Sequence, residues 1–130
     1  MSETDKPVIM VVDDDPALQR LIVALLERAS LQPVSAMNAK EARKILQEDP
    51  LPNLMLLDIM LPETSGIEYL QELRANERFE HLPIIILSAL GNPEQIREGL
   101  DEGADRYLTK PYLANNLIRT VKEVLEEGRR

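Results

Sequence analysis

Short apolar runs alternate with amphipathic stretches along the chain. Residues 8–12 are all apolar, which indicates a strand that is buried on both faces, as in the centre of a parallel sheet. Asp15 and Pro16 then match the preferences of a helix N-cap and of the first helical position. Leu18, Ile22 and Leu25 follow at helical spacing, so a helix is expected to continue to about residue 29.

The same alternation continues through four more units. Further strands are predicted at residues 33–37, 53–57, 83–87 and 105–109. Asn38 with Glu41, and Ser65 with Glu68, resemble capping boxes at the starts of two helices. Gly103 is expected to close a further helix as a C-terminal cap. The predicted helices after these strands end near residues 47, 75, 103 and 127.

Five strand–helix units joined by short loops predict an α/β fold, an open five-stranded parallel sheet with helices on both faces. The 130 residues fit one domain. We expect a polar N-terminal tail at residues 1–6 and the domain at 7–127. Residues 128–130 are expected to form a C-terminal tail or the start of a linker.

The composition excludes several classes of function. Cysteine is absent, which excludes a disulfide scaffold and thiolate metal sites and favours a reducing, cytoplasmic compartment. No signal segment or apolar run long enough to span a membrane is present. The net charge is −8 and aromatic residues make up 3%, so direct nucleic-acid binding by this chain is not expected.

Chemically active side chains stand at the ends of the predicted strands. Asp13 and Asp14 follow the first strand, Asp58 the third, Ser88 the fourth and Lys110 the fifth. In open α/β sheets, ligands bind outside the carboxyl ends of the strands. Three carboxylates, a hydroxyl and an ammonium group are therefore expected at one edge of the sheet.

Neighbouring carboxylates repel one another, and a hard divalent cation relieves that repulsion. Mg²⁺ prefers oxygen ligands and is commonly held by one or two carboxylates together with phosphate and water. A carboxylate can also act as a nucleophile and form an aspartyl phosphate. Lys110 and the metal would then neutralise the phosphoryl oxygens.

These motifs, taken together, resemble the receiver domain of two-component response regulators. The acidic pair Asp13-Asp14, the spacing of Asp58, Ser88 and Lys110, and the residues around them agree with that family over residues 7–127. The matching segments are Val11-Val12-Asp13-Asp14, Asp58-Ile59-Met60-Leu61-Pro62 followed by Gly66, Ser88-Ala89 and Tyr107-Leu108-Thr109-Lys110-Pro111.

The resemblance implies a flavodoxin-like, doubly wound fold with strand order 2-1-3-4-5. It implies that Asp58 is the phosphoacceptor and that Lys110 contacts the phosphoryl group. The implied Mg²⁺ ligands, with Mn²⁺ as an alternative cation, are Asp14, Asp58 and the Met60 carbonyl, with Asp13 acting mainly through water. Ser88 would hydrogen-bond the phosphoryl group, and Tyr107 would change rotamer in response.

The resemblance also implies partners and a mode of action. A sensor histidine kinase or a histidine phosphotransfer protein would donate the phosphoryl group. The surface of the fourth helix, fifth strand and last helix would then control an output domain or protein whose identity the sequence does not specify. Apart from its own phosphorylation and dephosphorylation, the chain is not expected to be an enzyme, and no membrane contact is expected.

Two alternatives stay open at this point. A haloacid-dehalogenase-like phosphatase would use Asp13 as its nucleophile, although no late acidic metal pair of that family is found. A phosphorylation-independent protein-binding module on the same fold would often have lost Lys110 or one of the acids.

His81, the only histidine, lies in a charged loop and is interpreted as a solvated residue.

Some positions depart from the common pattern of the family. Asn116 and Thr120 stand where the winged-helix class of regulators usually carries an acidic and a basic interface residue. Met60 and Leu90, two residues beyond Asp58 and Ser88, are both apolar. Neither can hydrogen-bond a hydrolytic water, so slow self-dephosphorylation is expected.

Overall fold

Strands and helices alternate along the whole chain in a computed structural model that describes residues 6–88, 93–109 and 114–128. The strands are β1 (Val8–Val12), β2 (Gln32–Ala36), β3 (Leu54–Asp58), β4 (Ile84–Ser88) and β5 (Arg106–Thr109). The helices are α1 (Pro16–Arg28), α2 (Ala39–Leu46), α3 (Gly66–Arg74), α4 (Pro93–Asp101) and α5 (Ala114–Glu127), with a 3-10 helix, η2 (Glu77–Phe79), between α3 and β4.

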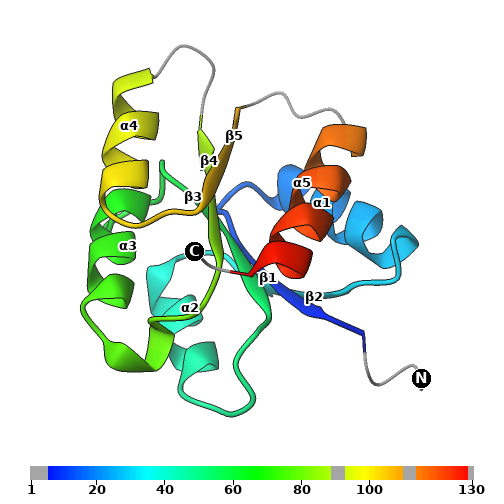
Figure 1. Ribbon diagram of the computed structural model, residues 1–130, viewed down its shortest axis with the longest axis horizontal. Helices are drawn as coiled ribbons and strands as arrows, with labels where there is room; N and C mark the ends of the chain where they lie inside the picture. Colours follow the sequence, from blue (N-terminus) through cyan, green and yellow to red (C-terminus); the bar gives the residue numbers. More distant parts are fainter. Residues whose placement is uncertain (1–5, 89–92, 110–113, 129–130) are drawn as a thin grey trace.

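The five strands form one parallel sheet in the order β2-β1-β3-β4-β5. Helices α1 and α5 cover one face of the sheet, and α2, α3 and α4 cover the other (Figure 1). The predicted α/β class and the strand order 2-1-3-4-5 are therefore confirmed. Strand order reverses between β1 and β3, where a ligand site is expected in such a sheet.

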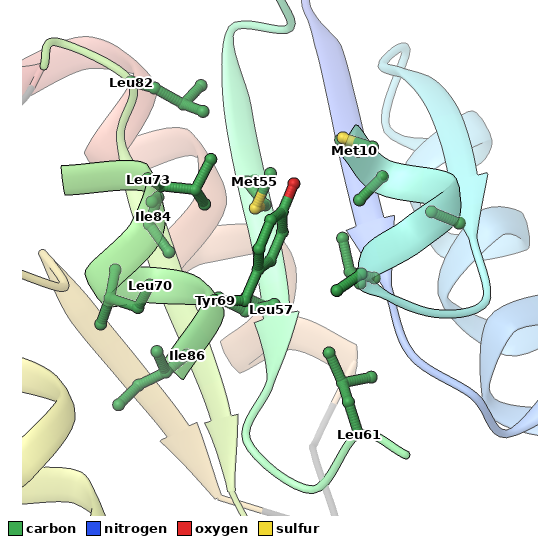
Figure 2. Close-up of a cluster of buried hydrophobic side chains, with 14 of the residues drawn as sticks. Met10, Met55, Leu57, Leu61, Tyr69, Leu70, Leu73, Leu82, Ile84 and Ile86 are labelled. Atoms are coloured by element: carbon green, nitrogen blue, oxygen red, sulfur yellow. The ribbon is translucent and has the colours of Figure 1, made fainter. Parts of the chain in front are cut away.

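Each face of the sheet has its own apolar core, because successive residues of a strand point to opposite faces. On β3, Met55 and Leu57 pack toward α2 and α3, whereas Leu54 and Leu56 pack toward α1 and α5. In the first of these cores, Tyr69 reaches from α3 across β3, with its hydroxyl directed toward the end of the strand that carries Met55 (Figure 2). Continuous apolar strands are thus explained by burial on both sides.

The helix starts follow the caps expected from the sequence. Asp15 Oδ1 accepts hydrogen bonds from the backbone N–H groups of Ala17 and Leu18 at 3.0 and 3.3 Å, with Pro16 in the first helical position. Ser65 and Glu68 form a complete capping box at the start of α3. Both devices satisfy donors that the first turn of a helix leaves unpaired.

The structure differs from the sequence-based expectation at a few boundaries. β2 lies one residue earlier than predicted, at Gln32–Ala36. β3 and β4 each lie one residue later, so that Asp58 and Ser88 are their last residues. The 3-10 helix at Glu77–Phe79 was not expected; its N-cap is Asn76, whose side chain accepts from the Arg78 N–H at 2.9 Å.

Among the helices of the described residues, none combines the length and apolar character that a membrane span requires.

Candidate functional site

Polar side chains gather at the carboxyl ends of the three central strands. Asp13 directly follows β1, Asp58 is the last residue of β3, and Ser88 is the last residue of β4. β1 and β4 each pair with β3, so these residues stand on adjacent strands at one edge of the sheet (Figure 1). The structure thus places Asp13, Asp58 and Ser88 at the carboxyl ends of adjacent strands.

Three carboxylates form an acidic cluster at this edge. One oxygen from each of Asp13, Asp14 and Asp58 lies within 4.8 Å of the other two. Asp13 is fully buried and Asp58 is 2% exposed, whereas Asp14 faces solvent. All the donors are hard carboxylate oxygens, so the set suits Mg²⁺, and it is open to water on the Asp14 side.

Local backbone hydrogen bonds orient both buried carboxylates. Asp13 Oδ1 accepts from the Asp15 N–H at 2.9 Å, and Asp58 Oδ1 accepts from the Met60 N–H at 3.0 Å. In each case the aspartate bonds to the residue two positions on, the turn that Asp side chains favour. The carboxylate orientation is therefore built into the loops that leave β1 and β3.

Gly66 holds the loop after β3 against the strand end. Its N–H donates to the Ile59 carbonyl at 2.8 Å. A Cβ at this position would collide with the Asp58 carbonyl oxygen and would come within 2.6 Å of Ile59 Cα. The loop can therefore fold back on Asp58 only because residue 66 has no side chain.

Ser88 and Tyr107 lie on neighbouring strands with opposite exposure. Ser88 is fully buried, and its hydroxyl has no hydrogen-bond partner among the described residues. Tyr107, on β5, is 47% exposed. The buried hydroxyl is available to donate to a new acceptor at this edge, whereas the tyrosine is partly open to solvent.

The loop after β3 also touches α4. The Gln95 side-chain amide nitrogen lies 3.9 Å from the Met60 sulfur. The Met60 side chain is 60% exposed, the largest exposure among the exposed large apolar side chains of the described residues. This contact links Met60, whose backbone N–H donates to Asp58, to the first turn of α4.

Several residues that the sequence singled out do not enter the described site. Lys110 and Leu90 lie outside the residues that the structure describes. His81 is exposed and precedes β4, so it stands at the amino end of that strand, away from the acidic cluster. Asp15 caps α1, the structural role expected for it, and also donates its N–H to Asp13.

Sequence reasoning missed Gln19, which is 5% exposed on the inner face of α1. It shares that buried face with Ile22 and Leu26. Its side-chain amide donates to three backbone carbonyls at the ends of β1 and β2. A polar residue in register with an apolar helical stripe is the signal that could have identified it.

Comparison with known protein families and structures gives a consistent result. A family model described as the response regulator receiver domain matches residues 9–122. The receiver domain of the Francisella response regulator 1452 superimposes with a TM-score of 0.84 at 34% identity, covering 94% of this chain and 98% of that one. The receiver domain of NtrX from Brucella abortus gives a TM-score of 0.84 at 29% identity, covering 91% and 98% of the two chains.

Curated relatives include phosphate regulon transcriptional regulatory proteins named PhoB. The protein from Pseudomonas aeruginosa is 39% identical over 117 residues, which is 90% of this chain and 51% of that protein. The protein from Rhizobium meliloti is 40% identical over 123 residues, covering 95% and 54%. The chain thus spans about half the length of the curated relatives that it matches.

Proposed function

Because the chain belongs to the response regulator receiver domain family, we propose that it accepts a phosphoryl group on Asp58 from a phosphohistidine. The donor would be a sensor histidine kinase or a histidine phosphotransfer protein. The observation that carries this proposal is the placement of Asp58, a buried carboxylate at the end of β3 with Asp13 and Asp14 beside it. A receiver domain is a signalling phosphoacceptor, and its phosphorylation changes its own state rather than that of a released substrate.

The acidic cluster would hold Mg²⁺, or Mn²⁺ through the same oxygens. Asp14, Asp58 and the Met60 carbonyl would contact the cation directly, and Asp13 would act mainly through water. When bound, the cation supplies positive charge that offsets the charge on the phosphoryl oxygens. The three carboxylates favour such a cation because one oxygen of each lies within 4.8 Å of the others, and a cation between them lowers their mutual repulsion.

In the transfer step, one Asp58 carboxylate oxygen forms a bond to phosphorus while the bond from phosphorus to the histidine nitrogen breaks. The electron pair of that bond stays on the imidazole. The Met60 N–H, which donates to Asp58 Oδ1 at 3.0 Å, holds the carboxylate in a defined orientation for attack. Lys110 would contact the phosphoryl oxygens, a role that rests on the sequence alone.

Ser88 and Tyr107 would convert the modification into a change of surface. A phosphoryl group brings new acceptor oxygens to the edge of the sheet. The buried Ser88 hydroxyl, which has no partner among the described residues, would donate to one of them. To make this hydrogen bond, Ser88 would move inward, toward the phosphoryl group. That inward movement would make room beside β5 for Tyr107, which is 47% exposed, and would reshape the surface of α4, β5 and α5.

The switched surface would act on an output segment or a separate partner. In relatives named as transcriptional regulators, the matched region is only 51% and 54% of the protein, so an output of that kind would lie outside this chain. This chain itself carries a net charge of −8, which opposes contact with a nucleic-acid backbone. We therefore propose that any action on DNA depends on that other segment or partner.

Locating the modified residue distinguishes this proposal from the two alternatives. The chain is incubated with acetyl phosphate and Mg²⁺, digested, and examined by mass spectrometry under conditions that preserve acyl phosphates. A phosphoryl group on the peptide that contains Asp58 is expected. Modification of Asp13 would favour the phosphatase alternative, and an unmodified chain would favour a phosphorylation-independent binding module.

A further inference from the structure

Gln19 is a polar residue on a helix face that otherwise packs into the core. It is 5% exposed and lies in register with Ile22 and Leu26 on α1. Burying an amide is costly unless its hydrogen bonds are satisfied. Gln19 takes no part in the proposed phosphoryl transfer, so its position on this face needs a separate explanation.

The side-chain nitrogen of Gln19 lies at the ends of two strands at once. It is 2.9 Å from the Val11 carbonyl oxygen, 3.1 Å from that of Asp13 and 3.0 Å from that of Ala36. A primary amide has two hydrogens, so the three carbonyls share them. One side chain of α1 thereby ties the carboxyl end of β1 to the carboxyl end of β2.

These bonds form part of a hydrogen-bond network around Asp13. The Ala36 carbonyl also accepts from the Asp13 N–H at 3.1 Å, and Asp13 Oδ1 accepts from the Asp15 N–H at 2.9 Å. Asp15 in turn caps α1, the helix that carries Gln19. The backbone and carboxylate of Asp13 are therefore held from three directions.

The carbonyl oxygen of Gln19 shows that the amide is not optimised for stability alone. That oxygen, Oε1, is buried and has no hydrogen-bond partner among the described residues. An unpartnered buried acceptor destabilises a fold, and an apolar side chain of similar length would avoid that cost. What such a side chain lacks is the donor at the strand ends.

We propose that Gln19 is a positioning residue for the cation site. By holding the Asp13 backbone, it keeps the Asp13 carboxylate in place beside Asp14 and Asp58 against their mutual repulsion. This inference rests on the proposed function, because it assumes that the three acids bind Mg²⁺. Mg²⁺ demands near-ideal ligand geometry, so an acid free to move away contributes less to its binding.

A purely structural role for Gln19 makes a different prediction. If the amide only joins α1 to the sheet, its loss lowers the unfolding temperature and leaves the Mg²⁺ affinity of the folded chain unchanged. If it positions Asp13, the affinity falls even where stability is kept. The affinity of the folded protein therefore separates the two roles.

The test is a calorimetric titration of the intact chain with Mg²⁺, comparing the parent with Gln19→Met and Ile22→Val. Met matches Gln closely in length and lacks the donor. Ile22 is equally buried on the same face of α1, and its substitution loosens the packing without touching a bond to Asp13. The dissociation constant should rise about tenfold in Gln19→Met, a typical effect of losing a residue that supports a metal ligand, and should stay at the parent value in Ile22→Val.

Gln19→Leu is the second variant if Gln19→Met does not fold. Leu is apolar, which suits the buried face of α1, and it also lacks the hydrogen-bond donor. Weaker Mg²⁺ binding in Gln19→Leu supports the positioning role, and parent-like binding overturns it. Parent-like affinity in Gln19→Met overturns the inference and leaves the proposed function intact, whereas a parent chain that does not bind Mg²⁺ overturns the proposed function itself.

Discussion

The Met60 amide donates a hydrogen bond to Asp58 Oδ1 at 3.0 Å, while the Met60 side chain is 60% exposed. The backbone N–H of Met60 thus orients the proposed phosphoacceptor, whereas its thioether is only a weak hydrogen-bond acceptor for a water molecule. Hydrolysis of an aspartyl phosphate needs a water aligned behind phosphorus. Residue 60 is therefore placed to influence how long the phosphoryl group persists.

Met60→Asn is expected to shorten the lifetime of the phosphoryl group on Asp58. One added hydrogen bond to the attacking water corresponds to roughly a 2- to 10-fold faster loss. The measurement follows the decay of phosphorylated protein by mass spectrometry after removal of acetyl phosphate. Met60→Leu, which adds no hydrogen-bonding group, is the control and should keep the parent rate.

The double variant Met60→Asn with Leu90→Gln extends this test to the second apolar position, which lies outside the described residues. It should lose the phosphoryl group at least as fast as the single variant. A double variant that decays no faster than the parent would contradict the role given to these apolar residues.

Gly66→Ala should destabilise the domain by about 1–3 kcal/mol, the usual cost of forcing an added carbon into a packed position. The new Cβ would collide with the backbone of Asp58 and Ile59, which cannot move aside as a flexible side chain can. Chemical denaturation measures the loss. Gln71→Ala, an exposed substitution on the same helix, should change stability little, and equal effects in the two variants would argue against the close approach.

Much of the architecture follows from local patterns in the sequence. Apolar runs such as Val8–Val12 identify the buried strands, and caps such as Asp15 and Ser65 identify where helices begin. The edge strand β2 was placed one residue late because Gln32 and Ser35 are exposed and no continuous apolar run marks it. The 3-10 helix at Glu77–Phe79 buries no residue, so hydrophobic periodicity could not reveal it.

The acidic residues of the site were predictable from the sequence, but the hydrogen bonds of Gln19 at the end of the strand that precedes Asp13 were not. Asp13 and Asp58 each close a buried strand, which is unusual enough to be noticed from the sequence alone. Gln19 acts through backbone carbonyls that converge only in the folded sheet, one of them from Ala36 on another strand. Sequence spacing does not show such a contact, because it depends on how β1 and β2 pair.

Tyr69→Phe should stabilise the protein. Tyr69 is fully buried on α3, and its hydroxyl has no hydrogen-bond partner among the described residues. Removing an unsatisfied buried hydroxyl is worth about 1 kcal/mol. Thermal unfolding at neutral pH measures the gain, and Tyr107→Phe, at a half-exposed position, is the control that should show none.

Tyr69→Phe should also make the stability of the protein less sensitive to high pH. Burial, reinforced by the nearby Glu72 carboxylate, raises the pKa of Tyr69 above its ordinary value. Since an unfolded tyrosine ionises near pH 10, the unfolded state loses this proton first, and the contribution of Tyr69 to stability declines as pH rises beyond about 10. Tyr69→Phe should therefore lose less stability than the parent between about pH 9 and 11, and parallel losses would contradict the effect.

Ser88→Ala should still accept a phosphoryl group but should lose most of the surface change. The donor hydroxyl is the contact that differs between the two states, and a ligand shifts a conformational equilibrium only through such differences. Backbone NMR shifts near Arg97, Tyr107 and Arg119 are compared with and without beryllofluoride, a phosphoryl mimic. Equal shift changes in parent and variant would show that Ser88 does not carry the signal, and no change in the parent would show that α4, β5 and α5 are not the output surface.

The most direct test of the central claim compares intact masses after incubation with acetyl phosphate and Mg²⁺. The parent is compared with Asp58→Asn and with Asp15→Asn, which removes a neighbouring acid but keeps an oxygen that can cap α1. One added phosphoryl group is predicted on the parent and on Asp15→Asn, and none on Asp58→Asn. A full-level phosphoryl adduct on Asp58→Asn would contradict the assignment of Asp58 as the phosphoacceptor.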